Sequence, residues 1–492
     1  MIPMSSKAWV EKAGLLPKGI IGAMSLRDTK RTLFFHVIGE IKLKRGNSYL
    51  IIFLAAVLLS LFFIIFDKDG SGVRNDATIY LGLAKNVLEG HGYSDQAIAP
   101  YAPTMSREPV YPLFLSFLLF ILKNNIFLIQ ISQAIIYAFT CLIIFRILTL
   151  IVSDERTAFK IAMINALFPA LPNYTAYLIA ETLFAFLLAL TVWFLVRAFK
   201  KNDLKAYLFS GIFLGLATLT RAVVVLFFSF VILIIILESI RRYKRLFVSL
   251  ILKQILLFFC GFLIIVLPWM MRNSLVVGKF SISSRGFNTM YVRASKVDLN
   301  KREMKMYALS CISENLAGKY FPGNNFSTTG EGYFYQAVQT KNKEYFDLKL
   351  SAEDTDLRFK EETIKLIGKH PFKFISLGFF EIIKFDSFGH SLLLNENYAG
   401  GLIKNSTSVS LLRGGLKLFG FLIAMFSIVG IILTRKEWFS WIVISSLILY
   451  FNFMQFFLDS IGRYAVPIIP YYIIMASYGF ILFFNKKRKK IA

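Results

Sequence analysis

Residues 126–152 read IFLIQISQAIIYAFTCLIIFRILTLIV and contain one charged side chain, Arg146. A helix needs about 20 predominantly apolar residues to cross the hydrocarbon core of a bilayer. The stretch meets that requirement, so it predicts a transmembrane α-helix.

Similar apolar runs recur along the rest of the chain. We expect ten spans, at 49–66, 126–152, 158–173, 176–197, 206–220, 222–240, 249–268, 415–434, 438–458 and 464–484. Only 17% of the 492 residues are charged, whereas average soluble domains are about 25% charged. The sequence therefore excludes a soluble globular enzyme and predicts an all-α polytopic membrane protein with about ten to thirteen transmembrane helices.

The net charge of +26 is concentrated in a few loops and at both ends. Lysine and arginine accumulate in cytoplasmic loops of membrane proteins. We therefore expect the basic segment 1–48, the loop 241–253 and the tail 485–492 to be cytoplasmic, and we expect no nucleic-acid partner. The chain shows no removable signal peptide, so the first span is expected to act as a retained anchor.

The expected domains follow from this topology, in which successive spans lead alternately to the cytoplasmic and the non-cytoplasmic face. A transmembrane catalytic module occupies 49–270, with its first loop, 67–110, on the non-cytoplasmic face. A small external α or α+β domain covers 271–371, and 372–484 contains an interfacial helix and the C-terminal spans. The apolar runs 111–122 and 372–385 are short, and we expect neither to cross the membrane, although 372–385 and a neighbour remain able to cross as a pair.

The first external loop contains unusually many charged and polar side chains. Residues 75–93 read NDATIYLGLAKNVLEGHGY, with apolar residues at the spacing of an amphipathic helix and glycines that end it. Such a helix lies on the membrane surface, and Asp76 at its start is favoured in its ionised form by the helix dipole. The loop thus predicts a carboxylate base at the membrane boundary, with a solvated helix cap as the alternative.

The chain contains three cysteines and four histidines. Three cysteines do not form a disulfide framework, and the histidines lack the spacing of zinc ligands. We predict no structural metal. A divalent ion held by Asp76, Glu181 and water remains open.

Short sequence strings between residues 74 and 470 resemble a known family. They are Asp76-Ala77 with Tyr80, Gly90, Gly92-Tyr93, Arg107 with Pro109 and Tyr111-Pro112, Ala180-Glu181 with Phe184, Gly211 and Gly215 with Ala217 and Arg221, Pro268-Trp269 with Arg272-Asn273, His370-Pro371 with Lys384, and Arg463-Tyr464 with Pro467 and Pro470. In this order they resemble the GT-C superfamily of integral-membrane glycosyltransferases. The nearest branch contains the protein O-mannosyltransferases and the bacterial lipid A aminoarabinose transferases.

The resemblance implies transfer of a sugar, with inversion, from a polyprenyl-phosphate carrier to an envelope acceptor. The reaction would occur at the outer face of a bacterial inner membrane, and the acceptor would be a lipid, a glycan or, less favoured, a protein. The resemblance also assigns Asp76 as the general base that takes the acceptor's proton. Glu181 corresponds to a second acid that faces the active-site cavity, where it would position the acceptor or hold a metal.

A lipid-phosphate leaving group requires cations, and guanidinium groups can donate two parallel hydrogen bonds to it. Arg107, Arg272 and Arg463 are expected at the outer boundary, with Lys85 as a further candidate; snorkelling at helix ends is the alternative for each. Arg221 lies between two apolar runs, where ionisable groups are functional candidates. Tyr80 and Tyr111 would line the site, although tyrosine is common at membrane interfaces in any case.

One departure from the pattern bears on the acceptor. The chain has Arg107-Glu108-Pro109 where the aminoarabinose-transferase branch has Glu-Lys-Pro, which argues against lipid A specificity. Two other functions remain open. An O-antigen-type polymerase or ligase would be expected to place its arginines in later loops, and a lipid-linked sugar flippase or transporter usually has repeated halves, which are not evident here.

Overall fold

The computed structural model describes residues 45–66, 73, 76–243, 248–284, 286–312, 314–324, 333–348, 350, 352–388 and 406–491. Residues 1–51 and 52–492 form separate units, and the second contains nearly all the helices. Most of the basic segment expected at 1–48, and residues 67–72 of the first loop, lie outside the described residues. All regular structure in the ranges just given is helical.

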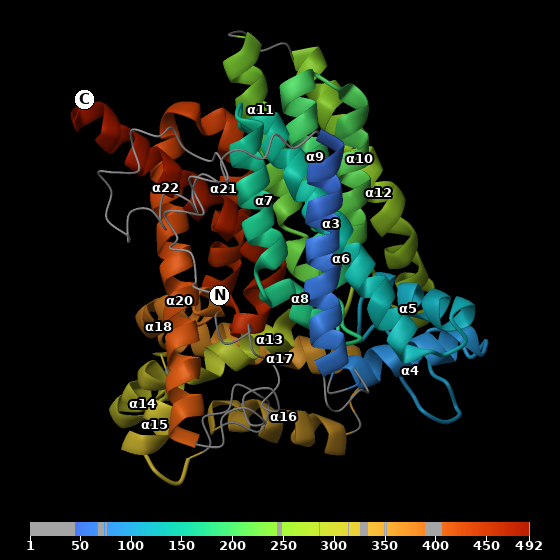
Figure 1. The fold of residues 1–492 in the computed structure, drawn as a ribbon. Coiled ribbons are helices and arrows are strands. Elements are labelled where there is room, and N and C mark those ends of the chain that lie inside the picture. The colour runs from blue at the N-terminus through green and yellow to red at the C-terminus, as the bar shows by residue number, and fades with distance from the viewer. Residues whose placement is uncertain are drawn as a thin grey trace, which may run out of the picture. The chain divides into compact units, whose positions relative to one another are not determined.

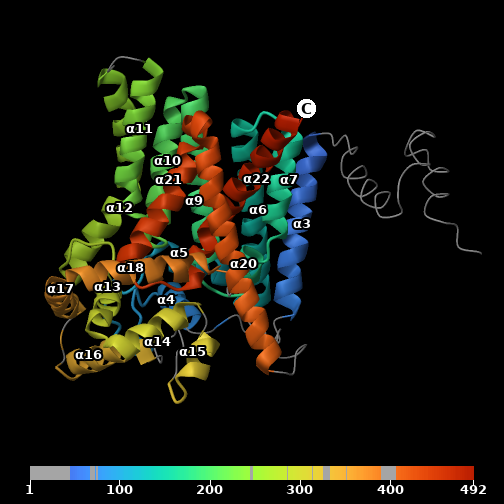
Figure 2. The same ribbon diagram turned by 90° about the vertical axis from the view of Figure 1, so that its left-hand side faces the viewer.

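The long apolar helices form a bundle, shown in Figures 1 and 2. They are residues 52–66 of α3 (Arg45–Phe66), α6 (Ile126–Ile151), α7 (Glu155–Leu167), α9 (Glu181–Lys201), α10 (Leu204–Thr218), α11 (Phe227–Tyr243), α12 (Val248–Val277), α20 (Ser406–Leu433), α21 (Trp438–Phe457) and α22 (Ile469–Ile491). Seven ranges among the described residues are long and apolar enough to cross a membrane, and one of them contains both α20 and α21. The protein is an all-α polytopic membrane protein; its full number of crossings stays a prediction.

The expected span 158–173 is interrupted near Pro169, and the helix expected from residue 176 begins only at Glu181. Helix α7 ends at Leu167, and Phe168 is extended with ψ of 122°, as expected for a residue that precedes proline. A short helix, α8 (Ala170–Tyr174), and a non-helical turn then lead to α9. The side chain of Gln133 donates to the carbonyls of Thr175 and Tyr177 at 3.0 and 2.8 Å, which satisfies backbone groups that a helix would otherwise pair.

Close approach of backbones holds part of the bundle together. A Cβ atom at Gly211 of α10 would lie 2.0 Å from the carbonyl oxygen of Phe258 on α12, and one at Gly261 of α12 would lie 2.2 Å from that of Leu208. Only glycine fits such contacts, and small residues are the usual means of close helix packing in membranes. The backbones of α10 and α12 are therefore in direct contact at these two glycines.

A layer of shorter helices lies across one end of this bundle (Figures 1 and 2). It consists of α4 (Asp76–Leu88), α5 (Val110–Ile121), α13 (Gly286–Ala294), α14 (Lys301–Ile312), α15 (Glu314–Tyr320), α16 (Gln336–Asp347), α17 (Ala352–Lys369) and α18 (Pro371–Asp386). The helices expected at 75–93, 351–369 and 372–385 correspond to α4, α17 and α18. Helix α12 extends to Val277, so the boundary expected at residue 271 falls inside a helix.

Candidate active site

Asp76 is the first residue of α4, and packing of that helix fixes its position. Tyr80 and Leu83 are buried on the inner side of α4. The Tyr80 ring meets the ring of Tyr111 on α5 edge-on, with centroids 4.9 Å apart, and the Tyr111 hydroxyl donates to Gln133 Oε1 at 3.0 Å. Tyr111 thus anchors α4 and α5 to the bundle.

Two arginines hold the Asp76 carboxylate. Arg107 Nη2 donates to Oδ1 at 2.6 Å, and Arg463 Nη2 donates to Oδ2 at 2.6 Å. Burial raises the pKa of Asp76, but the charges of Arg463 and Arg107 outweigh burial, so the net pKa is below its ordinary value. Asp76 is therefore an ionised carboxylate with a cation on each oxygen.

Glu181 lies beside this pair, at the first position of α9, and is fully buried. Its Oε1 accepts from Arg221 Nη1 at 2.7 Å and from Arg463 Nε at 2.5 Å. Arg463 therefore bridges both carboxylates. Three guanidinium groups face two carboxylates in this network, which leaves one positive charge in excess.

The network borders a cavity of about 410 Å³. Its charged lining residues are Asp76, Arg107, Glu108, Arg221, Asp459 and Arg463, and Tyr80 also lines it. Phe184, Phe451 and Met454 form an apolar part of the wall. A charged end beside an apolar wall suits a ligand that has both an anionic group and a hydrocarbon tail.

Three residues expected in the site lie elsewhere. Lys85 is exposed on α4 and does not line the cavity. Tyr111 is fully buried and does not line the cavity either. Arg272 donates to the carbonyl oxygen of Thr104 at 2.8 Å and lies over the Trp269 ring at 4.9 Å, so it joins the first loop to α12. Their substrate-binding roles stay predictions that the geometry does not favour.

Two carboxylates of the cavity were missed from the sequence. Glu108 follows Arg107 and accepts from the backbone N–H of Ala222 at 3.3 Å. Asp459 directly follows the apolar run 438–458, four residues before Arg463. This position could have identified Asp459 as a site residue from the sequence, because an acid directly after a predicted span lies at the boundary of the membrane.

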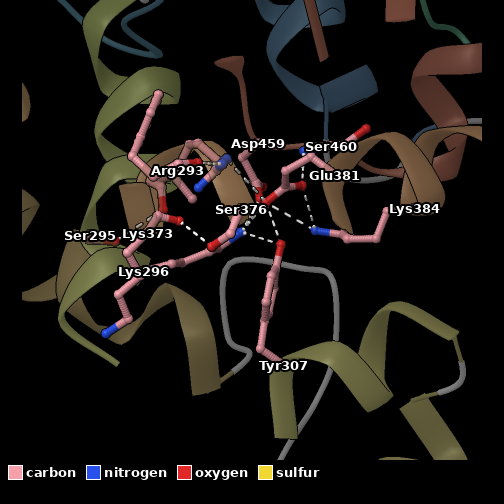
Figure 3. Close-up of polar contacts among 12 residues, drawn as sticks. Arg293, Ser295, Lys296, Tyr307, Lys373, Ser376, Glu381, Lys384, Asp459 and Ser460 are labelled. Atoms are coloured by element: carbon pink, nitrogen blue, oxygen red, sulfur yellow. Dashed lines mark hydrogen bonds and ion pairs between the residues drawn. The ribbon is translucent and has the colours of Figure 1, made fainter. Parts of the chain in front are cut away.

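Asp459 also belongs to a buried cluster of charges behind the cavity, shown in Figure 3. Lys296 pairs with Asp459 and also with Glu381, the latter at 3.0 Å. Lys384 Nζ lies 3.3 Å from Asp459 Oδ1, and the Tyr335 hydroxyl donates to Oδ2 at 2.6 Å. Burial raises the pKa of Asp459, but the two lysine charges outweigh it and the net pKa is lowered. Asp459 is therefore also ionised.

The cluster connects distant parts of the chain. Glu381 on α18 accepts from the Tyr307 hydroxyl of α14 and, at 2.9 Å, from the backbone N–H of Ser460. Arg293 of α13 donates to the carbonyl oxygen of Phe374 at 2.6 Å. The helices α13, α14 and α18 are thereby attached to the segment that carries Asp459 and Arg463.

A divalent ion between Asp76 and Glu181 does not fit this arrangement well. Both oxygens of Asp76 already accept from guanidinium groups, and three arginine charges surround the position where the ion would bind. Within the described residues, no group of three or more metal-ligand side chains is present.

Residues 103–271 match the family model of dolichyl-phosphate-mannose-protein mannosyltransferases. The match covers about a third of the chain, and over that segment the chain is similar to this mannosyltransferase family. The match agrees with the resemblance seen in the sequence. It includes Arg107, Glu181 and Arg221 of the ion-pair network but neither Asp76 nor Arg463. A comparison with curated proteins finds no match.

Proposed function

We propose that the protein transfers a sugar, with inversion, from a polyprenyl-phosphate donor to an envelope acceptor at the outer face of a bacterial inner membrane. The observation that carries this proposal is the network of Asp76, Arg107, Glu181, Arg221 and Arg463 at the charged end of the cavity. The family match supports glycosyl transfer of the GT-C type. The donor, the acceptor and the orientation are our proposals.

The arginines suit the leaving group. As the bond between the sugar and the phosphate breaks, negative charge develops on the phosphate oxygens, and fixed guanidinium donors stabilise it. Arg107, Arg221 and Arg463 all line the cavity, and so does Glu108. The three arginines therefore offer hydrogen-bond donors to a phosphate, while Asp76, Glu181 and Glu108 balance their formal charge.

Donor binding also prepares Asp76 as the base. A phosphate that accepts hydrogen bonds from Arg107 and Arg463 competes with Asp76 for the same donors. The Asp76 carboxylate then regains a free lone pair. Its pKa rises towards the ordinary value, because Arg107 and Arg463 now also interact with the phosphate. The acceptor hydroxyl attacks the anomeric carbon and gives its proton to Asp76, while the electrons of the breaking C–O bond go to the phosphate.

Glu181 acts through the arginines. It is buried and contacts both Arg221 and Arg463, so it fixes the direction of their remaining N–H groups. The apolar side chains of Phe184, Phe451 and Met454 line the same cavity, where they suit the first isoprene units of the donor.

Mass spectrometry of lipid-linked sugars and envelope glycans in a deletion strain tests this proposal. Accumulation of a polyprenyl-phosphate sugar together with loss of one glycan substituent is expected, and the missing substituent would identify the acceptor. A flippase would move the donor across vesicles that contain no acceptor. A polymerase or ligase would leave single sugar additions intact and shorten or detach a polymer, and either outcome would contradict transfer by this site.

A further inference from the structure

A second charged cavity, of about 320 Å³, lies at the other end of α21. Ser440 lines it, whereas Phe451, the first residue of α21 to line the candidate active site, is 11 positions further on. At 1.5 Å per helical residue, these two lining residues are about 17 Å apart along the helix. This distance makes the second cavity independent of the sugar-transfer site, and its function does not depend on the one proposed above.

A buried carboxylate organises two of its cations. Glu238 on α11 has a side chain only 4% exposed. It accepts from Arg241 Nε and Nη2 at 2.9 and 2.7 Å, and from Arg242 Nη2 at 2.8 Å. The Arg241 guanidinium also lies 4.3 Å from the centroid of the Phe439 ring. Two guanidinium groups are thus fixed in place by one negative charge.

Two lysines from other helices complete the lining. Lys200, at the end of α9, donates to Ser440 Oγ at 2.7 Å, and Lys436 has no ion-pair partner among the described residues. The only other acid in the lining is Glu437. Four cations therefore face two carboxylates, and cations from α9, α11 and the turn before α21 converge on one cavity.

We propose that this cavity binds the phosphate group of an anionic phospholipid. Arginine and lysine are the side chains that recognise phosphate, and basic pockets between transmembrane helices bind lipid head groups. A lipid is favoured over free phosphate because the cavity lies at the ends of membrane-spanning helices, and the rings of Phe199 and Phe439 provide apolar contact for the glycerol and first acyl carbons. The bound lipid joins the ends of α9, α11 and α21.

Native mass spectrometry of the full chain, titrated with phosphatidylglycerol or phosphatidylcholine, tests the proposal. We expect wild type to retain phosphatidylglycerol preferentially. Lys436→Gln and Arg241→Gln should each weaken that binding about fivefold, the loss expected for one cation near an anionic surface. Lys436 is exposed and Glu238 keeps Arg242 in the second variant, so both are expected to fold. Thermal unfolding of each variant in detergent checks this.

Lys201→Gln is the matched control, because Lys201 is next to Lys200 at the end of α9, is exposed and does not line the cavity. It should leave lipid binding unchanged. Equal retention of the two lipids by wild type, or an equal loss in Lys201→Gln, would overturn the proposal in favour of general surface charge. Displacement of phosphatidylglycerol by an equimolar amount of inorganic phosphate would overturn the choice of a lipid. None of these readouts depends on sugar transfer.

Discussion

Replacing Arg463 with methionine should destabilise the protein, because one guanidinium bridges two carboxylates. Arg463 donates to Asp76 at 2.6 Å and to Glu181 at 2.5 Å. Hydrogen bonds to charged groups contribute about 1.5–3 kcal/mol each, and breaking a buried ion pair from one side costs about 3–5 kcal/mol. Arg107 and Arg221 still contact the two carboxylates, so we expect the lower end, about 3 kcal/mol.

A double-mutant cycle with Glu181→Gln separates this bridge from lost packing. In the Glu181→Gln background, removal of Arg463 no longer leaves the negative charge of Glu181 without this partner. The double variant should therefore be about 1.5–3 kcal/mol more stable than the sum of the two single losses implies. Equilibrium unfolding in detergent micelles measures these free energies. If the losses in the free energy of unfolding are additive within about 0.5 kcal/mol, Arg463 does not bridge the two carboxylates.

The pair of Arg197 and Asp203 provides a control for the same measurement. Its atoms are 2.8 Å apart, but the Arg197 side chain is 40% exposed. Exposed ion pairs contribute about 0–1 kcal/mol, so Arg197→Met should cost little. A loss as large as that of Arg463→Met would show that the method does not distinguish buried from exposed pairs in this protein.

Three further predictions follow from the same contacts. Arg107→Ala removes a charge that opposes the effect of burial on Asp76, so the pKa of Asp76 rises and the acidic limb of the pH profile of kcat/KM moves to higher pH. Lys296→Met leaves Asp459 with one lysine instead of two, and limited proteolysis should then cut the region 286–388 faster. A cysteine introduced at Thr340 should react with an impermeant reagent from outside the cell, because α16 lies at the same end as the candidate site.

Each of these predictions has a contradicting result. An unchanged acidic limb in Arg107→Ala would separate that limb from Asp76. Lys305→Met serves as the control for proteolysis, since Lys305 is exposed on α14; equal cutting of both lysine variants would deny the cluster a special role. Labelling of Thr340→Cys only after lysis would reverse the proposed orientation.

Local sequence patterns predicted the helices around the site well. The spacing of apolar residues in 75–93 corresponds to α4, and the start of α9 at Glu181 follows the turn containing Pro169. These features depend on neighbours in the chain. The sequence therefore placed Asp76 at a helix start, whereas the expected span 176–197 began five residues before Glu181, the first residue of α9.

Such local patterns could not predict contacts between residues that are far apart in the sequence. Lys296 meets Glu381 and Asp459, which are 85 and 163 residues away, and no periodicity records those distances. Arg272 looked equivalent to Arg463 in the sequence, since both lie at predicted span ends. In the fold, only Arg463 faces the cavity, because the direction of each side chain depends on the packing of its helix.

Asp76 is proposed to accept the proton of the attacking hydroxyl. Asp76→Asn keeps the size of the side chain but removes its basic lone pair. Sugar transfer by the purified variant should fall at least about a hundredfold, as expected for loss of a general base, while donor binding stays within a few-fold of wild type. Glu89→Gln, an exposed acid just beyond α4, is the control and should keep full activity. Full transfer by Asp76→Asn would contradict the account.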